Sequence, residues 1–222
     1  MPAPLVVYGQ GRAHPWAYPD DVVGRFRSGY QLNGTPAALT EWRITTGDPE
    51  VAAAVYDLLG GDAPQEWPAK GEDNLEVFTA TGEVEILLAG PKAVRQRLVL
   101  REHRPTGRRR AAPSFVPVPE VQIDFKLVGA EALGSFSFRS ASWTLLEELR
   151  SQSTPERLAA ARAGLCARLG LETVSYTPAV GPRAGRPVLH TTPRLVLAEP
   201  GRRQSASIAR SSLSSLPSSS PS

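Results

Sequence analysis

The side chains that could carry out acid–base, nucleophilic or metal chemistry are scattered along this sequence. Its three histidines, His14, His103 and His190, lack partners at the spacing of a metal site. Its single cysteine, Cys166, excludes an intrachain disulfide, and the apolar residues around it predict a small buried thiol. The serines near position 140 lack the glycine elbow and the ordered Asp and His of a hydrolase. We therefore expect a protein that is not an enzyme and that binds no metal or other cofactor.

Tryptophan and arginine offer a different chemistry, because these residue types contribute most to the energetic centres of protein interfaces. Four candidates for contact with a protein partner follow from residue type and from expected positions in loops or at element ends: Trp42, Arg43, Trp67 and Arg139. Core packing explains Trp42 equally well, and it is the favoured interpretation of Trp143. Trp67 lies in a proline-containing loop, where we expect an exposed ring.

The excess positive charge lies in two short arginine-rich segments. The formal net charge is +3 at pH 7. The arginines responsible are Arg101, Arg104, Arg108, Arg109 and Arg110 in the first segment, and Arg202, Arg203 and Arg210 in the second. Solvated linker charge is the favoured interpretation of these arginines, and Arg108, Arg109 and Arg110 are the candidates for the alternative, contact with phosphate. A domain that reads DNA should carry a basic face, whereas the parts expected to fold are acidic or nearly neutral.

Composition divides the chain into five parts. Residues 1–23, with several prolines and no period, predict a weakly ordered arm, and the serine-rich residues 201–222 predict a disordered tail. Two blocks, 24–101 and 120–200, are expected to fold. A basic linker rich in proline and arginine, 102–119, joins them.

In the first block a helix is followed by a predicted β-hairpin. Asp48 suits the N-cap and Pro49 the first helical position, while Gly60 and Gly61 stop the helix. Apolar residues alternate on both sides of a Thr-Gly turn, which predicts a hairpin over residues 74–88.

The second block is predicted to hold two strands, two helices and a closing hairpin. Alternation predicts strands at 121–129 and around Phe136 and Phe138, and Ser142 should cap the next helix. Ser153 and Glu156 have capping-box spacing, which predicts a second helix that ends at Gly170; the closing hairpin lies over 172–199. These patterns predict an α+β fold of antiparallel sheet hairpins with helices packed on one side, and they leave open two similar sub-domains.

Four segments occur in an order that resembles a known family. They are "VGRFRSGYQLNGTPAALTEWRITTGDPEVAAAVYDLLGG", "KGEDNLEVFT", "VQIDFKL" and "LGSFSFRSASW". Their order resembles that of the recombination directionality factors of large serine integrases, of the actinophage type, over most of residues 24–175. Many members carry a cysteine-containing insertion between the two blocks, where this chain has "RPTGRRRAAPSFVPVP".

The resemblance implies a phage protein that binds its serine integrase while the integrase holds attachment-site DNA. Such a factor regulates site-specific DNA recombination: it promotes prophage excision, left site with right site, and inhibits integration. It takes no small-molecule substrate and reaches DNA indirectly, in the cytoplasm of the bacterial host. The alternative is a small basic excisionase-like factor that binds and bends DNA itself. We expect no membrane association, since the sequence lacks a long apolar run and a signal peptide.

Overall fold

The computed structural model describes residues 7–8, 19–32, 35–67, 73–103, 114–161, 163–181 and 184–198. The elements in chain order are β1 (Val7–Tyr8), β2 (Val22–Leu32), β3 (Thr35–Thr46), α1 (Pro49–Leu59), β4 (Gln65–Glu66), β5 (Leu75–Phe78), β6 (Glu83–Leu88), β7 (Val94–His103), β8 (Ser114–Leu127), the 3-10 turn η1 (Glu131–Leu133), β9 (Ser135–Ser140), α2 (Trp143–Ser151), α3 (Thr154–Ala160), β10 (Leu165–Tyr176) and β11 (Val188–Leu197). The α+β class expected from the sequence is confirmed. Most of the predicted N-terminal arm, and the serine-rich tail, lie outside the described residues.

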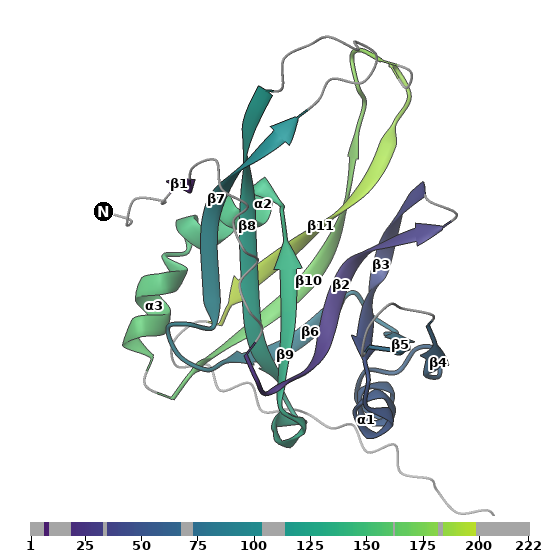
Figure 1. The fold of residues 1–222 in the computed structure, drawn as a ribbon, viewed down its shortest axis with the longest axis vertical. Coiled ribbons are helices and arrows are strands. Elements are labelled where there is room, and N and C mark those ends of the chain that lie inside the picture. Colours follow the sequence, from purple (N-terminus) through teal and green to yellow (C-terminus); the bar gives the residue numbers. More distant parts are fainter. Residues whose placement is uncertain are drawn as a thin grey trace, which may run out of the picture.

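The strands form one sheet that folds over into two layers (Figure 1). The large layer has the order β7-β8-β9-β2-β3-β5-β4, with β1 beside β7, and the small layer has the order β6-β10-β11. The layers are joined where β6 pairs with the end of β8, at Ile86 with Leu127 and Leu87 with Lys126. The core therefore lies between two faces of the same sheet.

Strands of the two sequence blocks share this sheet. β2 pairs in parallel with β9, so that Phe26 lies opposite Phe138. β6 lies between β8 and β10, both of which come from the second block. The pairing is antiparallel apart from β2 with β9 and β1 with β7. The blocks are therefore not seen as two sub-domains, because each supplies neighbours to the other.

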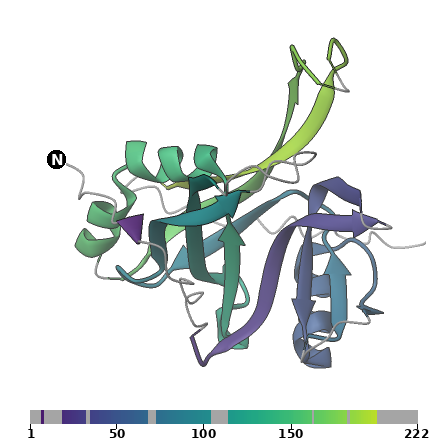
Figure 2. The ribbon, with the colours of Figure 1, turned by 45° about the horizontal axis from the view of Figure 1, so that its top comes forward.

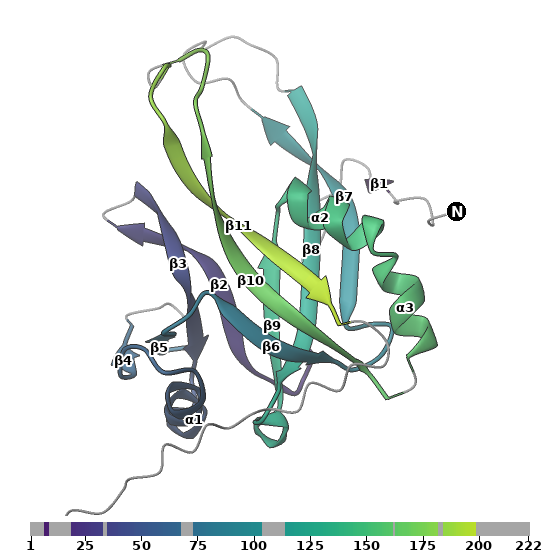
Figure 3. The same cartoon turned by 180° about the vertical axis from the view of Figure 1, so that it is seen from behind.

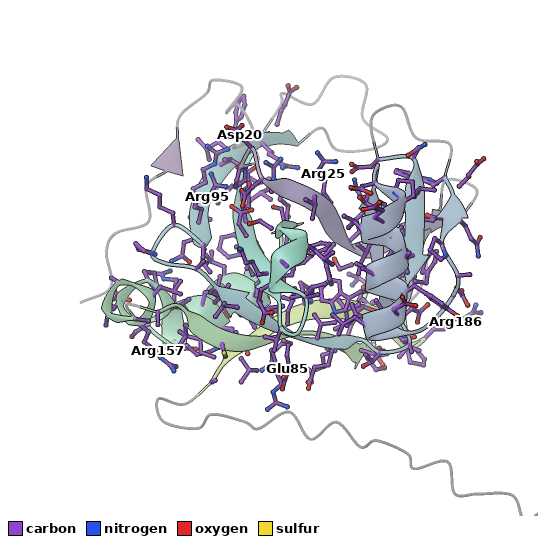
Figure 4. All side chains as sticks on the ribbon, turned by 90° about the horizontal axis from the view of Figure 1, so that it is seen from below. Asp20, Arg25, Glu85, Arg95, Arg157 and Arg186 are labelled. Carbon is purple, nitrogen blue, oxygen red and sulfur yellow. The ribbon has the colours of Figure 1, made fainter. Side chains whose placement is uncertain are left out.

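The helices close opposite open sides of the two-layer structure. α1 packs against β3 and β5, whereas α2 packs against β11 and β8. Figure 4, seen from below, shows α1 at one side and α2 with α3 at the other. Packing of all helices on one side, which the sequence led us to expect, is not observed, because both open sides of the core need an apolar cover. α1 contributes Val51, Ala52 and Val55 to that cover.

Both predicted ends of α1 are confirmed. The carboxylate of Asp48 accepts a hydrogen bond from the backbone N–H of Glu50 at 2.8 Å, and Pro49 occupies the first turn. After the helix, Gly60 and Gly61 have φ of 64° and 101°. A Cβ at Gly61 would lie 2.0 Å from the carbonyl oxygen of Phe78, so this position requires glycine for both conformation and space.

A cluster of aromatic rings fills the centre of the core. Trp42 is fully buried and meets Phe26 and Phe138 edge to face, with centroids 5.5 and 5.1 Å apart. Phe26 also meets Phe125 at 5.1 Å. These rings come from β2, β3, β8 and β9, so they hold neighbouring strands of the large layer in one register.

The hairpin predicted over residues 74–88 does not form. β5 pairs with β3 and β4, whereas β6 pairs with β10 and β8. The turn between β5 and β6 instead carries the chain from the large layer to the small one. At its start the backbone N–H of Thr79 donates to the carbonyl of Trp42, and at its end the carbonyl of Gly82 accepts from the backbone N–H of Leu171. The alternation of apolar and polar residues predicted both strands correctly, but it does not specify which strands pair with one another.

The predicted helix over residues 153–170 is also wrong beyond its first turns. α3 ends at Ala160, and Ser153 makes no capping hydrogen bond. β10 begins at Leu165, and Ala167 and Leu169 are buried while Cys166 and Arg168 are exposed. Cys166 is therefore not the buried thiol that we expected. The apolar residues within 165–169 fit the spacing of a helix and that of a strand equally well. Pairing with β6 is what makes this segment a strand.

In the predicted linker, 102–119, the described residues 102–103 and 114–119 are strand. β7 and β8 pair from Val94 with Ile123 to His103 with Ser114. Both flanks of the linker therefore belong to a long antiparallel hairpin. Residues 104–113, which include Arg108, Arg109 and Arg110, lie outside the described residues.

Candidate functional site

The outer surface of the large layer is rich in arginine. Along β2, Arg25 and Arg27 flank the buried Phe26, and along β9, Arg139 follows the buried Phe138. Figure 4 shows Arg25 and Arg95 on the side of the large layer that faces away from the small layer. We call this surface the arginine face; its guanidinium groups belong to Arg25, Arg27, Arg43, Arg95, Arg97 and Arg139.

Strand register aligns four of these arginines in one row across the sheet. Gln122 lies opposite Arg95 on one side and Arg139 on the other. Arg27 lies opposite Arg43, and the pairing of Phe26 with Phe138 places Arg27 next to Arg139. At a strand spacing of about 4.8 Å, the row from β7 to β3 spans roughly 19 Å.

Carboxylates on the same surface pair with these guanidinium groups. Arg43 Nε lies 2.6 Å from Glu76 Oε2, and Arg95 Nη2 lies 2.6 Å from Asp124 Oδ2. Arg97 pairs with Glu120 at 2.5 Å, and Arg25 pairs with Asp73. These described pairs join four arginines of the face to four carboxylates, which holds the charged side chains in fixed positions.

Trp67 adds an aromatic ring to the arginine face. The guanidinium carbon of Arg43 lies 4.2 Å from the centroid of the Trp67 ring, and that of Arg27 lies 5.8 Å away. The backbone N–H of Trp67 donates a 2.8 Å hydrogen bond to the carbonyl of Asn74, which fixes the backbone that carries this ring. Cross-strand pairs of like charge such as Arg27 and Arg43 are unfavourable, and the π face of the indole offsets part of that repulsion.

A polar network orients Arg139. Its Nε donates to Gln122 Oε1 at 2.8 Å, and Gln122 Nε2 donates to Asp124 Oδ1 at 2.9 Å. Ser137 Oγ donates to the same Asp124 oxygen at 2.6 Å. Because Gln122 is fully buried, this chain fixes Arg139 from beneath rather than leaving it to rotate in solvent.

Three of the four interface candidates therefore lie on one surface. Arg43, Trp67 and Arg139 belong to the arginine face. Arg43 is only 5% exposed, because the ring of Trp67 lies over its guanidinium group. Trp42 points to the opposite side of β3 and is fully buried, so its assignment to an interface is wrong and its alternative as a core residue is correct. Trp143, for which we favoured the core, is 46% exposed.

Sequence reasoning missed Arg25, Arg27, Arg95 and Arg97. Their signal was present as arginine at alternate positions in "RFR" and "RQR", which on a strand places both guanidinium groups on one face. Guanidinium groups in such an array bind carboxylates or phosphates through paired hydrogen bonds. The part of the arginine face that a partner can reach is made mainly by Arg25, Arg27 and Arg95, whose side chains are 27%, 39% and 29% exposed.

The described part of the chain holds no cluster of three His, Cys, Asp or Glu side chains that could form a metal site. Within the same residues no helix has the length and apolar character needed to cross a membrane. Comparison with protein-family models and with solved structures finds no match to this chain.

Proposed function

We propose that this protein is a recombination directionality factor. It binds a phage large serine integrase on attachment-site DNA, promotes excision between left and right sites, and inhibits integration. It works in the cytoplasm of the bacterial host, where it contacts DNA through the integrase and makes or breaks no bonds itself.

One observation carries this proposal: the sequence segments that resemble the family are neighbours in space. They fall on β2, β3 and α1, on β5, on β8, and on β9 with the start of α2. In the sheet, β8, β9, β2, β3 and β5 are consecutive strands. Segments far apart in sequence, such as those that hold Phe26 and Phe138, thus form one continuous part of the large layer, which is what a shared structural unit requires.

The physical requirement on such a factor is differential affinity. A partner that binds both synaptic arrangements of the integrase equally shifts neither. Reversing a preference from 1:99 to 99:1 takes about 5.5 kcal/mol of difference, and a few well-packed anchor residues in an interface supply that amount. The arginine face, with Trp67 at its surface, supports the proposal because it offers the residue types that act as such anchors.

An electrophoretic mobility shift distinguishes this function from the excisionase-like alternative. The proposal predicts that the protein shifts the complex of integrase with attachment-site DNA further and leaves free DNA in place. A shift and bend of free DNA, without integrase, would support the alternative factor instead. A protein that shifts neither species would contradict both.

A further inference from the structure

The outer half of the β10–β11 hairpin projects beyond the rest of the molecule (Figures 1 and 2). β10 pairs with β6 only over Leu165–Gly170, whereas its pairing with β11 continues to Tyr176 opposite Val188. Beyond Gly170 the small layer thus narrows to a two-stranded ribbon. We call the described residues 173–181 and 184–190 the arm.

The body end of this hairpin is firmly anchored by α2. Glu148 Oε2 accepts from the N–H of Leu195 at 3.0 Å, and Gln152 Nε2 donates to the carbonyl of Leu195 at 2.7 Å. Arg194 pairs with Glu148 at 2.9 Å and with Glu172, and the hydrogen bond to Glu148 raises the pKa of Arg194 above its usual value. The base of the arm is therefore held in a fixed direction.

Farther out, the arm exposes apolar side chains on both faces. The exposed fractions are 51% for Tyr176, 64% for Leu189 and 83% for Val180. Tyr176 packs its ring edge to face against His190, with centroids 5.5 Å apart. A two-stranded ribbon is only marginally stable in water, and clustered apolar side chains on a protruding element mark a surface that binds another protein.

The distribution of charged residues in the arm indicates which class of partner it can bind. Between Thr173 and Thr191 the sequence carries two formal charges, those of Arg183 and Arg186 in the segment that joins β10 to β11, whereas the paired strands 173–176 and 188–191 carry none. Phosphate contacts require clustered Lys and Arg, so this part of the arm does not fit a nucleic acid. Paired strands without formal charge that expose tyrosine and leucine fit an apolar protein surface, where an aromatic ring can fill a pocket.

We propose that the arm docks on an apolar surface of the integrase, with Tyr176 and Leu189 as its anchors. This inference rests on the function proposed above and names the contact through which the partner is held. Figure 3 shows the arm from behind, reaching past the β2–β3 hairpin. At its inner end the hydroxyl of Thr191 donates to the carbonyl of Leu39 at 2.8 Å, so the surface open to a partner lies farther out, at Tyr176 and Leu189.

Paired double variants of the full-length chain test this contact. Tyr176→Ser with Leu189→Ser removes the two anchors. Tyr56→Ser with Leu58→Ser removes the same residue types from α1, where they are 37% and 40% exposed. Binding of each variant to the purified matched integrase is measured by isothermal titration calorimetry, and thermal melting checks that both variants fold.

The arm variant should bind at least tenfold more weakly than the wild type, and the α1 variant within about twofold of it. Equal binding by the arm variant and the wild type would overturn the arm as the docking element while leaving the proposed function standing. Absence of binding by the wild type would instead overturn the proposed function and the arm contact with it. If the arm variant binds integrase normally but loses self-association in analytical ultracentrifugation, the occupant is a second copy, and the inference is wrong.

Discussion

The ring of Trp67 lies over the guanidinium group of Arg43, with 4.2 Å between the ring centroid and the guanidinium carbon. Arg43 is nearly buried and is held from the side by Glu76. The indole therefore forms the outer layer of this contact and the arginine its support. This division assigns binding to Trp67 and stability to the residues beneath it, and the two roles can be separated by mutation.

Trp67→Ala should weaken binding to the integrase by about tenfold, or about 1.4 kcal/mol, because it removes the aromatic part of the arginine face. Titration calorimetry measures the change. Trp143→Ala is the matched control, since Trp143 is 46% exposed on α2, away from that face. Equal affinity of Trp67→Ala and the wild type would remove the arginine face from the interface.

Trp42→Ala should act on folding instead. The Trp42 ring is fully buried between Phe26 and Phe138, so its loss should lower the free energy of unfolding by about 3–5 kcal/mol. Urea denaturation measures this. Trp67→Ala should cost less than about 1 kcal/mol in the same assay, and a similar loss for the two variants would argue against their separate roles.

Glu76→Gln should destabilise the fold by about 3 kcal/mol, because it leaves the buried guanidinium group of Arg43 without its carboxylate. The control is Glu83→Gln, whose pair with Arg168 has side chains 57% and 50% exposed. Exposed pairs contribute little, so this control should change stability by less than about 1 kcal/mol. Equal losses in urea denaturation would show that the Arg43–Glu76 pair acts as a surface pair.

The phosphate contact predicted for Arg108, Arg109 and Arg110 is tested by salt dependence. In the complex of protein, integrase and DNA, replacing all three with glutamine should lower the slope of log affinity against log salt. The decrease should be about 1 for each phosphate that the variant no longer neutralises. An unchanged slope would assign these arginines to solvated charge. The measurement is a mobility-shift titration at several salt concentrations.

The parts of the fold that depend on neighbouring residues could be predicted from the sequence. Asp48 and Gly60 marked both ends of α1 because capping involves atoms within one turn. Ser142 marked the start of α2 for the same reason, and its hydroxyl accepts from the N–H of Leu145 at 3.2 Å. The alternating strands around Phe125 and Phe138 followed from burial of one face.

Pairing between distant strands could not be predicted. Nothing local to Val77 and Val84 shows that one strand joins β3 and the other β10, since both simply alternate. The arginine face was missed in part for the same reason, because Arg27 and Arg139 become neighbours only through the parallel pairing of β2 with β9. Near Leu165, apolar spacing fitted a helix and a strand equally, and tertiary contacts decided.

An in vitro recombination assay tests the central claim most directly. Purified matched integrase is supplied with paired left and right sites, and separately with the paired sites of integration, each with and without this protein. We predict that the protein turns on recombination between left and right sites and suppresses integration. The same product distribution with and without the protein would show that it is not a directionality factor.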